Sequence, residues 1–527
     1  MNIRKPLVIA VALALAGPGL AQADQVSDLK AQLEAMQKQM DALKSQLDQV
    51  TTQVQTQKQA QEKQEAKNAQ FVQMAPGSGL TFLAPGGGDV TIYGNFDVSF
   101  DTSTKGLQSS YDPGGSPVGN MGWMPAIASN LSYLGARGRH PVASDVNFVW
   151  QLEAGIDISA TPGTRATNSN TSASVNGALF SRNSFVGFTS PSWGGVMIGK
   201  SETPYKTSTD RLNPFSGMVG DYRVIMGNTG GDNRVEFGYR APHAIWYESP
   251  SWSGASFKAM YSPGQNRADD SSNLSSGEAD CAGGNIPGSG ALPPSCNDGA
   301  FSNLYSFSGA YVYGPLYVTA AYEMHKKVNR TSDTIGFPTT PPADTQGDPN
   351  DVGDESAFKI GAQYAFPTKT TVSVLWERTK RSIPSYLEYQ NERTRDNATW
   401  LAVSQALTEK DVLSVGWAHA GATPGDTGQH NTPGGLNPDN SANMYTLAWK
   451  HLIDRNTTVY AGYAMTKNHP DAHYDLGAGG HGVTTDCHDA SQEAAFDPTT
   501  GGVTGNGPHC FAGGKLQAVS VGVNYRF

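Results

Sequence analysis

The feature that most constrains the fold is a regular alternation of short and long links between segments with alternating apolar and polar side chains. We predict sixteen such strands, most of them close to the roughly 9–11 residues that a tilted membrane strand needs. The predicted strands are 90–104, 130–139, 145–160, 178–189, 194–201, 233–249, 252–263, 301–313, 315–326, 356–367, 369–380, 396–406, 409–421, 441–452, 455–466 and 515–527. Short and long links in strict alternation predict an up-and-down antiparallel barrel with all long loops at one end.

The links also predict how the barrel is oriented. The long links are 105–129, 161–177, 202–232, 264–300, 327–355, 381–395, 422–440 and 467–514. An even number of strands places both ends of the barrel on the side of the short turns. In outer-membrane barrels the short turns face the periplasm, so we expect both ends there.

The two faces of the predicted barrel are clearest in its last strand. Apolar side chains that suit lipid alternate there with small or polar ones that suit water: Val519, Val521, Val523, Tyr525 and Phe527 against Ala518, Ser520, Gly522, Asn524 and Arg526. Charged residues are 16% of the 527 residues, below the roughly 25% of soluble globular proteins. The alternative, a soluble β-sandwich, needs no set of long loops on one side. We therefore expect an all-β, 16-stranded antiparallel transmembrane β-barrel.

The first 23 residues have the pattern of a secretory signal peptide. A basic start (MNIRK) is followed by the apolar run Leu7–Leu20 and the cleavage pattern Ala21-Gln22-Ala23. The formal charge of the whole chain is −10, which argues against a nucleic-acid partner because such proteins carry a basic surface.

Residues 24–70 predict an α-helical coiled coil ahead of the barrel. Their apolar positions alternate spacings of three and four residues: Val26, Leu29, Leu33, Met36, Met40, Leu43, Leu47, Val50 and Val54. A heptad seam of this kind predicts a left-handed coiled coil, and thus self-association. A lone amphipathic helix is the alternative. Residues 71–89 are rich in Pro and Gly and are predicted as a linker to the barrel at 90–527, which would place the coil in the periplasm.

Four cysteines remain in a chain expected to be exported into an oxidising compartment, which favours disulfides. The sequence-near pairing is Cys281–Cys296 and Cys487–Cys510, although sequence alone leaves the pairing open. Histidines crowd the last long link, but the chain lacks the usual metal-ligand spacings, so we predict neither a metal site nor a cofactor. No converging nucleophile, base and acid can be singled out, so we do not expect an enzyme.

Several motifs resemble those of a known family. They are VTIYG at 90–94 with Asp97, SYLGARG at 132–138 with QLE at 151–153, FSRNSFVG at 180–187 with IGK at 198–200, RAPHAIWYESP at 240–250, and NYRF at 524–527. In order and spacing they resemble the trimeric general porins of Gram-negative outer membranes, especially the β-proteobacterial type. The resemblance covers residues 90–527 and not the coiled coil.

The resemblance implies a water-filled lumen, narrowed where the third long loop, 202–232, folds inward. Acids on that loop then face arginines on the opposite wall. Strand alternation, read with the family pattern, places five charged side chains on the lumen face: Arg137, Glu153, Arg182, Lys200 and Arg240. Phe185 and Ile245 are then expected to face lipid. Asp210 and Asp221 are the candidate acids of the loop, but nearby Arg211 and Arg223 leave the polarity open.

Three departures from the family pattern make the expected lumen wall less charged: Tyr133, Pro242 and Trp246 stand where charged residues are common. We predict a channel for passive diffusion of small hydrophilic solutes in the bacterial outer membrane. The alternatives are a solute-selective channel and a structural spacer between the outer membrane and the cell wall. The expected partners are two further copies in a homotrimer, outer-membrane lipid and lipopolysaccharide, the diffusing solutes and, in the spacer hypothesis, the cell wall.

Overall fold

The chain divides into two units, residues 1–70 and 71–527. The structure, a computed structural model, describes 79–105, 122–159, 182–227, 237–263, 303–326, 354–382, 393–422, 439–469 and 514–527, apart from 85, 157, 239 and 440, and isolated positions in 34–45 and 472–504. The predicted signal peptide, all four cysteines and the apolar seam of the predicted coiled coil lie outside the described residues. The positions described between Glu34 and Ser45 are helical and exposed, and no described helix is long and apolar enough to cross a membrane.

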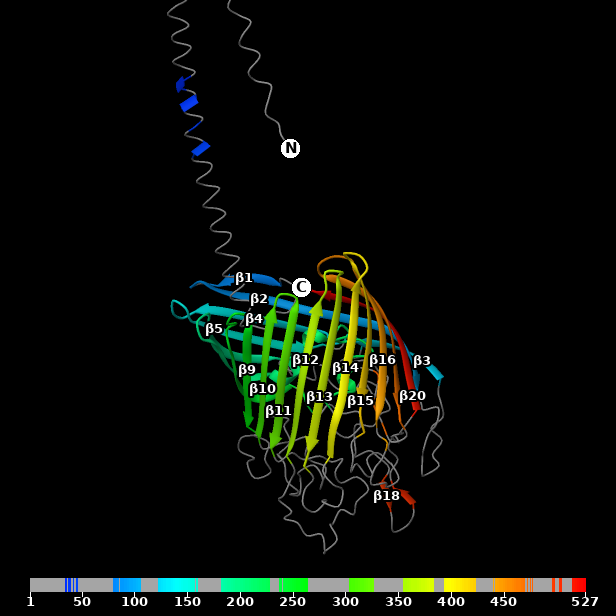
Figure 1. Cartoon of the computed structure of the whole chain (residues 1–527). Coiled ribbons are helices and arrows are strands. Elements are labelled where there is room, and N and C mark those ends of the chain that lie inside the picture. Colours follow the sequence, from blue (N-terminus) through cyan, green and yellow to red (C-terminus); the bar gives the residue numbers. More distant parts are fainter. Residues whose placement is uncertain are drawn as a thin grey trace, which may run out of the picture. The chain divides into compact units, whose positions relative to one another are not determined.

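The second unit is a closed antiparallel barrel. Its wall strands are β2 (Gly88–Lys105), β3 (Gly122–Ser129) with β4 (Tyr133–Pro141), β5 (Asn147–Gly155), β6 (Ser184–Ser190), β7 (Gly194–Glu202), β8 (Arg240–Glu248), β9 (Ala255–Pro263), β10 (Asn303–Tyr313), β11 (Leu316–Lys326), β12 (Glu355–Ala365), β13 (Thr370–Arg381), β14 (Arg393–Ala406), β15 (Asp411–Ala420), β16 (Ala442–Leu452), β17 (Thr457–Asn468) and β20 (Gly514–Arg526). Pairing of β2 with β20 closes the sheet. Figure 1 shows the strands side by side, with the C-terminus at the end that carries the short turns.

The predicted strand count is confirmed, although the sheet has eighteen strands by pairing. Two of them, β3 and β4, are parts of one wall strand, because β3 pairs with the second half of β2 and β4 with the first half. Between them the Ser132 hydroxyl donates to the Asp97 carbonyl at 3.0 Å and accepts from the Asp97 amide at 2.9 Å. Leu131 there has a φ of 55°. This interruption is a β-bulge, which bends the strand without ending the wall.

The strand that does not belong to the sixteen-strand wall is β1 (Leu80–Ala84), which pairs with the start of β2. It lies inside the segment 71–89 predicted as a linker, so part of that segment is ordered as a hairpin. A small separate hairpin, β18 (Ala495–Asp497) with β19 (Gly502–Thr504), lies in the last long link. Among the described residues, the predicted strand 145–160 is shorter than expected and is found as β5, since Ile156, Ile158 and Ser159 lie outside it.

The two faces of the wall agree with the alternation in the sequence. On β20, Val519, Val521 and Val523 are 40–55% exposed, whereas Ala518 and Ser520 are fully buried. Outward apolar side chains suit a lipid environment, and the inward face is small and polar or covered by the long segment between β7 and β8. The described part of that segment packs on the inner wall and so determines which side chains are left facing the interior.

Candidate pore constriction

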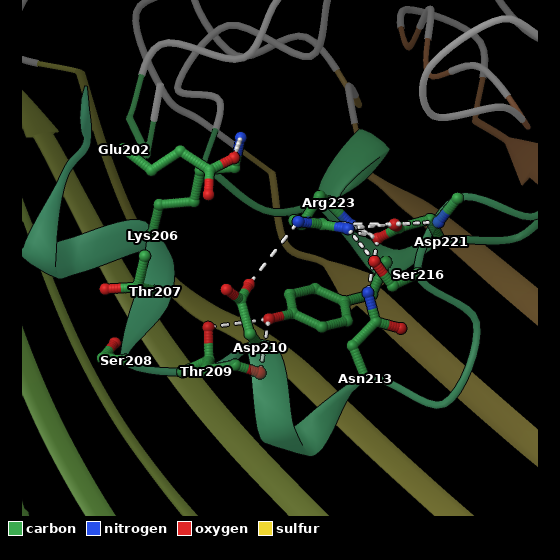
Figure 2. A network of polar contacts seen from close by, with 12 residues as sticks. Glu202, Lys206, Thr207, Ser208, Thr209, Asp210, Asn213, Ser216, Asp221 and Arg223 are labelled. Atoms are coloured by element: carbon green, nitrogen blue, oxygen red, sulfur yellow. Dashed lines mark hydrogen bonds and ion pairs between the residues drawn. The ribbon is translucent and has the colours of Figure 1, made fainter. Parts of the chain in front are cut away.

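The chain turns into the barrel directly after β7. Thr203 caps a single helical turn, α2 (Pro204–Thr207), by accepting the Lys206 amide at 3.3 Å, and Pro204 stands at the first helical position, where its missing N–H costs nothing. Two 3₁₀ turns follow, η1 (Asp210–Leu212) and η2 (Tyr222–Val224). We call the described part of this segment, Glu202–Gly227, the inner loop. Figure 2 shows its polar contacts.

Asp221 organises the second half of the inner loop. Its carboxylate is fully buried and accepts from the Arg223 guanidinium at both oxygens, with Nε at 3.0 Å from Oδ1 and Nη2 at 2.6 Å from Oδ2. It also accepts from the Asn213 amide at 2.8 Å and from the Gly217 N–H at 3.3 Å. Arg223 in turn donates to the Ser216 hydroxyl at 2.7 Å. One carboxylate therefore ties together three other residues of the loop, Arg223, Asn213 and Gly217.

Polar contacts also hold the inner loop against the wall of β10 to β17. The Tyr205 hydroxyl donates to Oε2 of Glu377 on β13 at 2.7 Å, and the Gly227 N–H donates to Oε1 of the same carboxylate at 2.7 Å. Lys359 on β12 donates to the Thr209 hydroxyl at 2.8 Å. Both ends of the loop are thus attached to neighbouring strands.

Apolar loop residues fit into recesses of this wall that glycines leave open. Leu212 and Phe215 are fully buried, and Phe215 packs edge-on against Trp400 with ring centroids 5.7 Å apart. A Cβ atom at Gly361 would lie 2.4 Å from Leu212, and one at Gly416 would lie 2.6 Å from Phe215. The wall glycines therefore permit the close approach of the loop.

Arg182 and Arg240, two of the arginines expected on the lumen face, pair with carboxylates on β5 and at the start of the inner loop. Arg182 Nε lies 2.5 Å from Oε1 of Glu153. Arg240 Nη2 lies 3.0 Å from Oε1 of Glu202, which Lys206 also contacts at 2.8 Å. Arg240 therefore lies beside the root of the inner loop, and two cations share the Glu202 carboxylate.

The two candidate acids of the loop differ in exposure. Asp221 is buried in its network and does not face the lumen, whereas the Asp210 side chain is 48% exposed and lies 3.6 Å from Arg223 Nη1. Enclosure by the loop and wall raises the pKa of Asp210 to about 6, although the Arg223 charge acts in the opposite direction. Burial also raises the pKa of Asp221, but the bidentate Arg223 contact outweighs burial and holds it below the usual range. Asp210 is therefore the loop acid that can change its charge near neutral pH.

The remaining predicted site residues, Arg137 and Lys200, lie on strands of the wall. Arg137 on β4 is nearly buried, with its guanidinium carbon 4.8 Å from the ring centre of Tyr93. The Tyr93 hydroxyl donates to Glu153 Oε2 at 3.0 Å, which links Arg137 to the Arg182 pair. Lys200 is half-buried on β7, where the register with β8 shifts between Gly199 and Ser201.

The expectation that Phe185 faces lipid is wrong. Phe185 is 8% exposed and packs edge-on against the buried Trp246, with ring centroids 5.1 Å apart, whereas Ile245 is 42% exposed as predicted. The expectation assumes that side chains alternate between the two faces from Arg182 onward, but β6 begins only at Ser184. Arg182 precedes it in a bend, where its backbone N–H donates to the Glu153 carbonyl at 3.0 Å. Alternation holds only within a regular strand.

Sequence reasoning missed Tyr205 of the inner loop and the wall residues that contact this loop: Lys359, Glu377 and Trp400. A charged residue on the inward face of a strand is a weak signal, since it suits any water-filled lumen. Nothing in the local pattern indicated which loop atom each would meet.

Comparison with known proteins decides the family, since the model for Gram-negative porins matches residues 10–471. The chain belongs to the Gram-negative porin family. It is 25% identical over 185 residues to an outer membrane porin protein of Bordetella pertussis, an alignment that covers 34% of this porin and 44% of that relative. The chain thus spans under half the length of the curated relative it matches.

A solved porin structure shares the fold of the barrel. An anion-selective porin from Comamonas acidovorans superposes with a TM-score of 0.54 at 17% identity, over 84% of this chain and all of that one. The outer-membrane protein OmpT of Vibrio cholerae superposes with a TM-score of 0.48 at 13% identity, over 85% of this chain and all of that one.

Lowering the pH from 7.5 to 5 is expected to shift the ion selectivity of this porin towards anions. Asp210 is mostly charged above its pKa of about 6 and mostly neutral below it, so acidification removes one negative charge beside Arg223 and Lys206. Reversal potentials across a salt gradient measure the shift. An Asp210→Asn variant should already show the acid-side selectivity at pH 7.5, and a full pH-dependent shift in that variant would contradict the assignment.

Proposed function

We propose that this porin is a passive diffusion channel in the bacterial outer membrane for small hydrophilic solutes and ions. One observation carries the proposal: the inner loop packs on the inside of a closed sixteen-strand wall whose outward face is apolar. A barrel of this size encloses a lumen wide enough for water, and the loop narrows it. The residues proposed to line the constriction are Arg137, Glu153, Arg182, Lys200, Arg240 and Asp210, whereas the buried Asp221 is proposed to hold the inner loop in place.

Purified protein added to a planar lipid bilayer tests this function. Stepwise insertion of ohmic channels supports it, and insertion without conductance overturns it. A purely structural spacer would give the second result, so the same recording separates the two functions.

A preference for anions is the second candidate, and the charge balance at the root of the inner loop favours it. Arg240 and Lys206 share the single carboxylate of Glu202, and Arg211 makes no ion pair among the described residues. The porin from Comamonas acidovorans is described as anion-selective, and we propose the same preference here. A permeability ratio of chloride to potassium at or below one would contradict it.

The N-terminal unit is proposed to assemble and position the channel. The heptad seam at 24–70 supports a periplasmic coiled coil, and coil and barrel together support a homotrimer surrounded by outer-membrane lipid and lipopolysaccharide. The pairs Cys281–Cys296 and Cys487–Cys510 are proposed as loop disulfides. A native mass in detergent that corresponds to a monomer or dimer contradicts the trimer.

Deleting residues 24–70 is expected to leave a channel with unchanged single-channel conductance. The reason is that the described wall strands and the inner loop all lie between Gly88 and Arg526. Bilayer recording on the deletion variant, expressed with the same signal peptide, measures this. A change in conductance would show that the coil contributes to the lumen, and the full-length chain in the same membrane is the control.

A further inference from the structure

Arg211 is held in one orientation on the inner wall by two strands. Its guanidinium carbon lies 4.9 Å from the ring centre of Tyr317 on β11. Its Nε donates to Oε1 of Gln363 on β12 at 2.9 Å, and the Gln363 amide donates back to the Arg211 carbonyl at 2.9 Å. Tyr317 and Gln363 pair directly across the two strands, so an aromatic ring and an amide together orient the guanidinium.

Among the described residues, no partner bonds the two terminal nitrogens of Arg211, which leaves them available to a ligand. The side chain is exposed and makes no ion pair among the described residues. Its neighbour Asp210 directs Oδ1 to Arg223, at 3.6 Å. Since Nε is already used by Gln363, the edge formed by the two terminal nitrogens offers parallel N–H donors, which match the two oxygens of a carboxylate.

The strand register places this group near the short turns. Tyr317 is the second residue of β11, which follows the short turn at Gly314 and Pro315, and Gln363 is two residues from the end of β12. Short turns of outer-membrane barrels face the periplasm. Arg211 therefore lies on the periplasmic side of the inner loop, away from the long links.

We propose that Arg211, Tyr317 and Gln363 form a carboxylate-binding subsite on the periplasmic side of the constriction, an inference that rests on the proposed channel function. The aromatic face beside the guanidinium favours a planar, partly apolar carboxylate over a spherical anion. Because the guanidinium is already oriented, little side-chain entropy is lost when a ligand binds.

Block of the chloride current by benzoate tests the subsite on the full-length channel. Benzoate added to the short-turn side is expected to reduce the wild-type current at lower concentration than benzoate added to the other side. Arg211→Lys keeps the charge but loses the planar fork, so the apparent dissociation constant of benzoate should rise about tenfold, the loss expected for a charged hydrogen bond.

The matched control is Arg455→Lys, since Arg455 is an exposed arginine in the short turn between β16 and β17. Benzoate should block the Arg455→Lys channel at the same concentration as the wild-type channel. The subsite is overturned if benzoate blocks Arg211→Lys as strongly as the wild type. It is also overturned if Arg455→Lys weakens the benzoate block as much as Arg211→Lys does. In either case, normal conductance leaves the channel function intact. A wild-type protein that inserts but never conducts overturns the channel function and the subsite together.

Discussion

An Asp221→Ala channel is expected to show a higher and noisier single-channel conductance than the wild type. The substitution leaves Arg223 and the Asn213 amide without their buried acceptor, and breaking a buried ion pair from one side costs roughly 3–5 kcal/mol. The second half of the inner loop should then leave the wall for part of the time, which widens the passage. Recordings in a planar bilayer at fixed salt measure both quantities.

The control for this experiment is Asp210→Asn, which changes an acid of the same loop that is half-exposed and meets Arg223 only at 3.6 Å. It should leave the conductance noise unchanged. The unfolding temperature of the Asp221→Ala barrel in detergent should equal that of the wild type, because the loop network contributes no strand pairing. Wild-type conductance in Asp221→Ala would mean that the loop does not depend on this carboxylate.

Replacing Arg182 and Arg240 together by alanine is expected to shift the channel towards cations. The change removes two positive charges and leaves Glu153 and Glu202 on the inner wall. A unit charge about 4 Å away contributes about 1 kcal/mol in water, or about fivefold in the relative occupancy of an ion. The shift should shrink at high salt, since the Debye length falls from about 10 Å at 0.1 M to about 3 Å at 1 M. Reversal potentials at both salt concentrations measure it.

A charge-neutral variant, Glu153→Gln with Arg182→Gln, is the matched control. It removes both members of one pair, so selectivity should stay near that of the wild type. An unchanged reversal potential in Arg182→Ala/Arg240→Ala at low salt would mean that neither arginine lies where ions pass. The barrel of the double alanine variant should be less stable than that of the control, because Glu153 is nearly buried and would keep, among the described side chains, only the Tyr93 hydroxyl as a donor.

The wall of the barrel was predictable from the sequence because its information is local. Alternation with a period of two, together with link lengths, sufficed for sixteen strands, their order and the exposure of Val519, Val521 and Ile245. The same reasoning failed at Phe185, since parity cannot be counted through the bend at Arg182 and Asn183. It also missed the division of the second wall strand at Leu131, where a side chain takes over hydrogen bonds of the ladder.

Within the candidate constriction, the resemblance of the sequence to the porin family singled out the inward-turning loop and its charged residues. The tertiary structure decided which of these charges face the lumen and which are used up in holding the loop. Thr209 meets Lys359 across 150 residues of sequence, and Leu212 accepts a hydrogen bond from Trp400 across 188. Such partners depend on how the closed barrel curves and on where glycines leave room, and neither is encoded in a pattern of neighbouring residues. The tertiary contacts bury Asp221, which holds the inner loop together, and leave Asp210 half-exposed.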